Sequence, residues 1–131
     1  MELIEICKKA KKVKYEIQCL TTKEKNDALL AVADKLVAEA DSIIAANAKD
    51  YERGVSNGMH KGLLDRLLLD KKRIEAMAEG LRQVAALPDP IGEVIDSFSR
   101  PNGLQIKKVR VPMGVIGIIY EARPNVTADA I

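Results

Sequence analysis

The sequence predicts an α/β protein, and three features of the 131-residue chain carry that prediction. Apolar residues repeat at the helical spacing of three and four as far as Pro88. Residues 92–112 have the pattern of a β-hairpin, and residues 114–120 form an apolar run typical of a strand inside a parallel sheet. Such a sheet needs neighbouring strands that the rest of this sequence does not offer. We therefore expect the chain to be the N-terminal part of a larger α/β protein.

The composition excludes several classes of protein. Hydrophobic residues make up 47% and charged residues 31%, which excludes a disordered or collagen-like chain. No apolar run approaches the roughly 18 residues of a transmembrane helix, so we expect no membrane partner. The net charge is only +2 and aromatic residues total 3%, so nucleic acid is not an expected partner. The lysines at residues 8–14 are interpreted as a solvated helix face.

The helical part is divided by its end signals. A first amphipathic helix is predicted over residues 2–19, with Cys7 on its apolar stripe, and we expect that thiol to be buried. A capping-box pattern at residues 21–24 begins the next helix, which is predicted to break near Asp41 and to end at Gly54.

The remaining helices are shorter or cut off. A short helix is expected over residues 63–69, and Asp70 is expected to cap a longer one that ends before Pro88. A last helix begins at Val126. Between the two halves, an Asn102-Gly103 turn closes the predicted hairpin, and the slip in alternation at residues 107–108 predicts a bulge.

One motif is specific enough to suggest a family. Tyr-Glu-Ala-Arg-Pro-Asn at residues 120–125 follows the apolar run, and segments 45–50, 64–67 and 74–85 lie upstream in a matching order. With these segments the chain resembles the γ-glutamyl phosphate reductase family of the aldehyde dehydrogenase superfamily. The resemblance covers essentially the whole chain.

The resemblance implies an aldehyde-dehydrogenase-like fold with three parts. Residues 1–91 would be the helical part of an N-terminal cofactor-binding domain. Residues 92–112 would form a hairpin through which the protein makes a homo-oligomer. Residues 113–131 would contain the first strand, turn and helix of a Rossmann-like sheet, cut short at the end of the chain.

The resemblance also implies a reaction and its partners. L-glutamyl 5-phosphate would be reduced with NADPH to L-glutamate 5-semialdehyde and phosphate, in proline biosynthesis in the cytoplasm, with functional coupling to glutamate 5-kinase. The family's nucleophilic cysteine would lie beyond this chain, so we expect the chain alone to be inactive. The alternative is a non-catalytic assembly module made of the helices and the hairpin.

Four residues of the motif are candidate site residues. Asn125 precedes a helix and could be its N-cap, whereas the resemblance implies an oxyanion donor for acyl transfer. Arg123 could be a solvated loop residue, or could contact the substrate phosphate or NADP. Tyr120 and Glu121 could pack at a strand end or line the cofactor cleft through their backbone.

The other chemically reactive residues are not candidates. Cys7 and Cys19 lie twelve apart and lack Cys-x-x-Cys spacing, so no metal site is predicted. His60, the only histidine, lies in a Gly-rich loop and is expected to be exposed.

Overall fold

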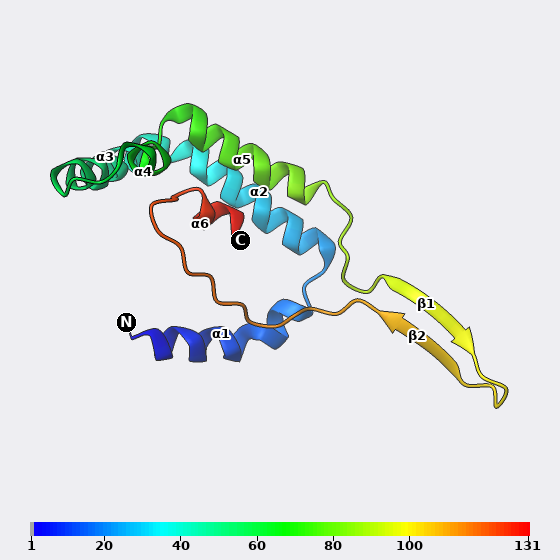
Figure 1. Ribbon diagram of the computed structural model, residues 1–131. Coiled ribbons are helices and arrows are strands. Elements are labelled where there is room, and N and C mark those ends of the chain that lie inside the picture. Colours follow the sequence, from blue (N-terminus) through cyan, green and yellow to red (C-terminus); the bar gives the residue numbers. More distant parts are fainter. Residues whose placement is uncertain (1) are drawn as a thin grey trace. The chain divides into compact units, whose positions relative to one another are not determined.

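The computed structural model of the chain describes residues 2–131. In chain order its elements are helices α1 (Leu3–Gln18), α2 (Thr22–Ala38), α3 (Ala40–Ser56), α4 (Lys61–Leu67) and α5 (Lys71–Ala85), strands β1 (Val94–Ser99) and β2 (Gln105–Val109), and helix α6 (Val126–Asp129). These elements form two compact units, each made of two stretches of chain (Figure 1). The first unit combines residues 1–22 with 88–117, and the second combines residues 23–87 with 118–131.

The second unit contains the buried core. Figure 1 shows α2 and α5 side by side with α6 against them. Their contact is made of small and branched side chains: Ala33 of α2, Ala78 and Leu81 of α5, and Ala128 of α6. Ile74, near the start of α5, is also completely buried. The predicted helical stripes of α2 and α5 are therefore confirmed, and they hold α6 in place.

The junction and the end of α3 differ from the prediction. The break falls at Glu39, two residues before the expected Asp41, and the helix runs past Gly54 to Ser56. Gly54 is buried within α3, where an added Cβ would lie 3.0 Å from Leu64 Cδ2 of α4. The glycine that terminates α3 is instead Gly58, which lies two residues after Ser56 and has a φ of +71°. The Met59 and Gly58 N–H groups donate to the Gly54 and Val55 carbonyls in the last turn of α3. The absence of a side chain at Gly54 thus allows α3 and α4 to approach closely, and Gly54 does not terminate the helix.

The first unit consists of α1 and the hairpin and has no buried residue among those described. The apolar stripe of α1 is present, but Leu3 is 74% exposed and Ile6 49% exposed. The expectation that Cys7 is buried is wrong: both Cys7 and Cys19 are exposed free thiols. The reason is that a helical stripe predicts a face that can be covered, and nothing in this unit covers it. The lysines at residues 8, 9, 11 and 12 are exposed, as predicted, whereas Lys14 is half-buried with its Nζ 4.5 Å from the centre of the Tyr15 ring.

The hairpin is confirmed, with a bulge in a different place. The strands pair antiparallel with Phe98 opposite Ile106. Gly103 has a φ of +84° in the turn, where its N–H donates to the Arg100 carbonyl. The bulge lies in β1 between Val94 and Asp96, not at residues 107–108. Lys107 and Lys108 instead stay in register opposite Ser97 and Asp96.

The predicted strand over residues 114–120 does not form. Residues 110–120 have no helical or strand structure, and the hairpin is the only sheet among residues 2–131. A parallel strand exists only when a neighbour accepts and donates its ladder hydrogen bonds, and no other stretch described here supplies one. No helix in the described part of the chain combines the length and apolar character that a bilayer crossing requires.

Candidate functional site

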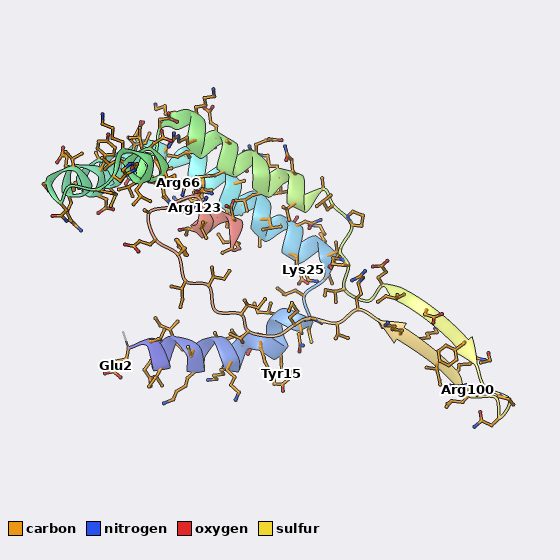
Figure 2. The ribbon with its side chains drawn as sticks, in the orientation of Figure 1. Glu2, Tyr15, Lys25, Arg66, Arg100 and Arg123 are labelled. Carbon is orange, nitrogen blue, oxygen red and sulfur yellow. The ribbon has the colours of Figure 1, made fainter. Side chains whose placement is uncertain are left out.

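A groove of about 500 Å³ in the second unit is the place where the predicted site residues meet other functional groups. Its walls come from α4, the start of α5, and the segment that leads into α6. The polar and charged side chains that line it are Asp65, Arg66, Arg73, Arg123, Asn125 and Asp129. Figure 2 labels Arg66 and Arg123, the two arginines that line the groove from α4 and from the segment before α6. The groove therefore joins residues far apart in the sequence.

Asn47 fixes the wall that α4 contributes. This asparagine lies on the apolar side of α3 and is 7% exposed. Its Nδ2 donates to the Leu67 carbonyl at 2.8 Å, and its Oδ1 accepts from the Leu69 N–H at 2.7 Å. Both ends of one amide thus bind the backbone that follows α4, where ordinary helical hydrogen bonds have ended. Asn47 holds the corner between α4 and α5.

Arg73 and Asp70 complete this corner. The Asp70 carboxylate accepts from the Arg73 N–H at 2.7 Å and caps α5, as predicted. The Arg73 guanidinium donates to the Asp65 and Leu68 carbonyls at the end of α4, and to the Asp65 carboxylate at 2.9 Å. These carbonyls have no helical partner of their own, so Arg73 caps α4 from the next helix. The guanidinium of Arg73 is consequently paired with groups of α4 and of the residue that follows it.

Asn125 lies at the start of α6, but it does not act as a side-chain cap. No backbone N–H of α6 donates to its side chain. Its Nδ2 instead donates to Asp129 Oδ2 at 2.9 Å. An amide nitrogen carries two hydrogens, so this bond leaves one N–H for another acceptor. The Asp129 carboxylate also fixes the orientation of the amide, because a carboxylate is an acceptor and must face the amide nitrogen.

The segment before Asn125 is shaped by its backbone and one side-chain bond. Ala122 has a φ of +53°, in the left-handed region that an alanine seldom adopts. The Tyr120 hydroxyl and Thr127 Oγ1 are 2.6 Å apart and share a hydrogen bond across this turn. The turn and the proline at 124 place Arg123 at the groove. A strained residue beside candidate site residues is typical of a site whose geometry the fold imposes.

The structure therefore brings together two of the four predicted site residues. Arg123 and Asn125 line the groove, whereas Tyr120 and Glu121 are exposed and are not among its lining residues. His60 is exposed, as expected, and its Nδ1 accepts from the Gly62 N–H at the start of α4. Residues 2–131 contain no cluster of three or more His, Cys, Asp and Glu side chains that could hold a metal ion.

Three residues that build this site are not among the predicted ones: Arg66, Asn47 and Arg73. Asn47 could have been noticed, because it falls three and four residues after Ile44 and Ile43, on a face that is otherwise apolar. Arg66 and Arg73 have no comparable local signal. Their roles depend on a helix corner and on a segment fifty or more residues later in the chain, which sequence spacing does not describe.

Comparison with known proteins gives a consistent result. Over 129 residues the chain is 57% identical to a γ-glutamyl phosphate reductase of Halalkalibacterium halodurans, covering 98% of this chain and 31% of that protein. A γ-glutamyl phosphate reductase of Heliobacterium modesticaldum is 61% identical over 123 residues, 94% of this chain and 30% of its own length. The crystal structure of the Thermotoga maritima γ-glutamyl phosphate reductase matches with a TM-score of 0.95 and 45% identity, over 99% of this chain and 31% of that one.

No family model matches the chain. The chain spans about a third of the length of the relatives that it matches. Most of the length of each relative therefore lies outside the part that this chain matches.

Proposed function

Because this chain belongs to the γ-glutamyl phosphate reductase family over the part of its relatives that it spans, we propose that the whole protein reduces L-glutamyl 5-phosphate. The products are L-glutamate 5-semialdehyde and phosphate, in a step of proline biosynthesis. The observation that carries this proposal is the 57–61% identity to γ-glutamyl phosphate reductases along nearly the whole chain. The alternative of a non-catalytic assembly module has no comparable support.

The reductant that we propose is NADPH, which would supply the hydride that converts the acyl group into the aldehyde. Residues 2–131 do not by themselves fit a whole dinucleotide, because no parallel sheet with a strand-edge crevice is formed among them. We keep Tyr120 and Glu121 as proposed backbone contacts at the cofactor cleft. The Tyr120 hydroxyl is already paired with Thr127, which is consistent with a role of its backbone rather than its side chain.

For Asn125 we propose the role of oxyanion donor. Acyl transfer places negative charge on the carbonyl oxygen of the substrate, and a fixed N–H directed at that oxygen stabilises the transition state. The Asn125 amide has one N–H free after its bond to Asp129, and it lines the groove beside Arg123. Asp129 is then a positioning residue, since it holds the amide with its nitrogen available. Arg123 is proposed to bind the phosphate of the substrate or of NADP.

Two proposals concern the rest of the molecule. The hairpin at residues 92–112 is proposed to join copies of the protein, because every strand residue except the half-buried Ile106 is exposed and no buried residue supports the strands. Functional coupling to glutamate 5-kinase, which makes the labile substrate, is proposed from the chemistry of an acyl phosphate. A reducing, cytoplasmic setting is compatible with the two exposed free thiols.

The experiment that tests the function uses the whole protein. We expect NADPH-dependent reduction of L-glutamyl 5-phosphate, and in reverse the phosphate-dependent oxidation of L-glutamate 5-semialdehyde. Asn125→Ala should lower kcat by about 10²–10³ with a smaller change in KM, because the lost bond strengthens in the transition state. Asn57→Ala, at the exposed C-cap of α3 and outside the groove, is the matched control. No activity in the unmodified protein contradicts the function, and an unchanged kcat in Asn125→Ala contradicts the role of the amide.

A further inference from the structure

The groove contains a second arginine for which neither the sequence analysis nor the proposed function has a use. Arg66 extends from α4 and lines the groove together with Arg123, which precedes α6. Within residues 2–131 no hydrogen bond or ion pair is made by either guanidinium, whereas Arg73 beside them is fully engaged with α4. Two unpaired cations on one groove repel each other, and an anion between them removes that repulsion.

The charges around the groove leave an excess of positive charge. The groove is lined by the three arginines Arg66, Arg73 and Arg123 and by the two aspartates Asp65 and Asp129, which leaves one net positive charge. Asp65 is neutralised by Arg73 at 2.9 Å, and Asp129 is hydrogen-bonded by Asn125. The groups left to meet a ligand are thus mainly the two arginine side chains and the second N–H of Asn125.

Both arginines stand on backbone that the fold holds in place. The end of α4 is tied down by Asn47 and by the cap from Arg73. Arg123 lies within the turn that Ala122 and the Tyr120–Thr127 bond define. A site whose backbone is fixed before the ligand arrives loses little entropy when it binds. The fixed backbone therefore favours specific binding at this groove.

We propose that Arg66 and Arg123 form a two-sided subsite for an oxyanion group of the substrate, with Arg66 as a binding residue from α4. The planar guanidinium fork binds a carboxylate and a phosphate equally well, and the substrate proposed above carries one of each. The groove volume of about 500 Å³ suits a small molecule of that size. The inference rests on the proposed function for the identity of the anion, but not for its existence.

Kinetics in the reverse direction separate the two anions. There phosphate and L-glutamate 5-semialdehyde are separate substrates, so each has its own KM. In the whole protein Arg66→Gln should raise one of these KM values about tenfold or more, with kcat changed less. A change for phosphate assigns the subsite to the phosphoryl group, and a change for the semialdehyde assigns it to the carboxylate. Arg66→Lys should recover only part of the loss, because it restores charge but not the fork.

The control is Lys61→Gln, which removes a positive charge from the same helix at an exposed position outside the groove. Unchanged KM values in Arg66→Gln, or an equal rise in Lys61→Gln, overturn the proposal. Arg66 is exposed and makes no structural bond among the residues described, so the variant should melt like the unmodified protein.

A binding measurement keeps this inference separate from the enzyme function. Calorimetric titration of the whole protein with inorganic phosphate, and separately with L-glutamate, requires no turnover. At least one of them should bind, and Arg66→Gln should weaken that binding about tenfold or more. If the unmodified protein shows no reductase activity but this result is obtained, the subsite stands and the proposed function fails. Binding of neither anion, or binding unaffected by the substitution, overturns the subsite.

Discussion

Both units of this chain contain amphipathic helices, yet only one unit buries its apolar residues. In the second unit α2, α5 and α6 enclose Ala33, Ala78 and Leu81 completely or nearly so. In the first unit the stripe of α1 and the apolar residues of the hairpin remain exposed. The difference shows that an apolar pattern specifies which face a segment offers, while burial depends on the presence of something to cover it.

The same comparison explains where the candidate site lies. Fixed side-chain geometry requires neighbours that restrict rotation, and the second unit supplies them through Asn47, Arg73 and the turn at Ala122. The exposed side chains of the first unit have few such restrictions. That unit is suited to contact another surface, which is the proposed role of residues 92–112.

The largest expected effect concerns the particle mass. We expect the chain to self-associate through residues 92–120, because the segment offers unpaired strand edges and exposed apolar side chains such as Phe98, Ile116 and Ile119. Light scattering over a concentration series measures it. Phe98→Ser should shift the distribution toward the monomer, whereas Ser97→Ala, on the opposite face of β1, should not. A monomer at all concentrations would contradict this prediction, because the exposed apolar residues of segment 92–120 would then not drive association.

A matched pair of isoleucines tests the comparison by stability. Ile74 is fully buried, and Ile74→Ala should destabilise the second unit by about 2–5 kcal/mol through lost packing and a residual cavity. Ile6 is 49% exposed, and Ile6→Ala should change stability by no more than about 0.5 kcal/mol. Urea unfolding followed by amide signals of α5 and α1 gives both values. Equal effects at the two positions would contradict the comparison.

A matched pair of asparagines tests the polar contacts. Asn47→Ala leaves the Leu67 carbonyl and the Leu69 N–H without partners in a buried place, which should cost about 2–4 kcal/mol. Asn102 makes a single bond to the Leu104 N–H in the exposed turn, and Asn102→Ala should cost about 1 kcal/mol or less. The same unfolding measurement compares them. A larger loss of unfolding free energy in Asn102→Ala than in Asn47→Ala would contradict the expectation that the buried asparagine contributes more to stability.

The smallest expected effect depends on pH and lies at the junction of α2 and α3. Lys35 Nζ donates to Glu39 Oε1 at 2.8 Å, and this bond and the lysine's charge lower the pKa of Glu39 from its ordinary value of 4.5. A carboxyl whose pKa is lower in the folded state stabilises the fold above the unfolded pKa. That contribution is lost as the pH falls through the folded pKa.

Melting temperatures of Glu39→Gln measure this contribution. At pH 7 the variant should melt slightly below the unmodified chain. Once the Glu39 carboxyl of the unmodified chain is protonated in acid, the two should melt at the same temperature. Glu52→Gln removes a carboxylate from an exposed position of α3 and is the control for a general effect of charge. A difference that persists in acid would point to a cause other than the Lys35 ion pair.

The confirmed predictions and the failed ones differ in how far apart in the sequence the interacting residues lie. The presence of α1, α2 and α5, the cap by Asp70 and the turn at Gly103 depend on residues within a few positions of one another, and these predictions are confirmed. Cys7 and the strand at 114–120 depended on partners elsewhere, and both predictions fail in this chain.

The candidate site shows the same limit. Arg123 and Asn125 were found because they belong to one contiguous motif, and both line the groove. The capping role considered for the Asn125 side chain is not observed, because its backbone is helical (φ −62°, ψ −29°) and not extended as at an N-cap. Its amide nitrogen donates to Asp129 one turn further on. Arg66 was not found, since only the corner held by Asn47 and Arg73 places α4 opposite a segment so distant in sequence.

The cap that Arg73 places on α4 also has a consequence for the order of folding. Helix α4 has seven residues, well below the roughly 12–15 that an isolated helix needs in water. Its last carbonyls acquire donors only when the first turn of α5 has formed and Asn47 has docked. During synthesis, Arg66 therefore emerges early but gains a defined place only after later residues have folded. Hydrogen exchange of α4 amides should follow that of α5, so that the two helices open and close as one cooperative unit.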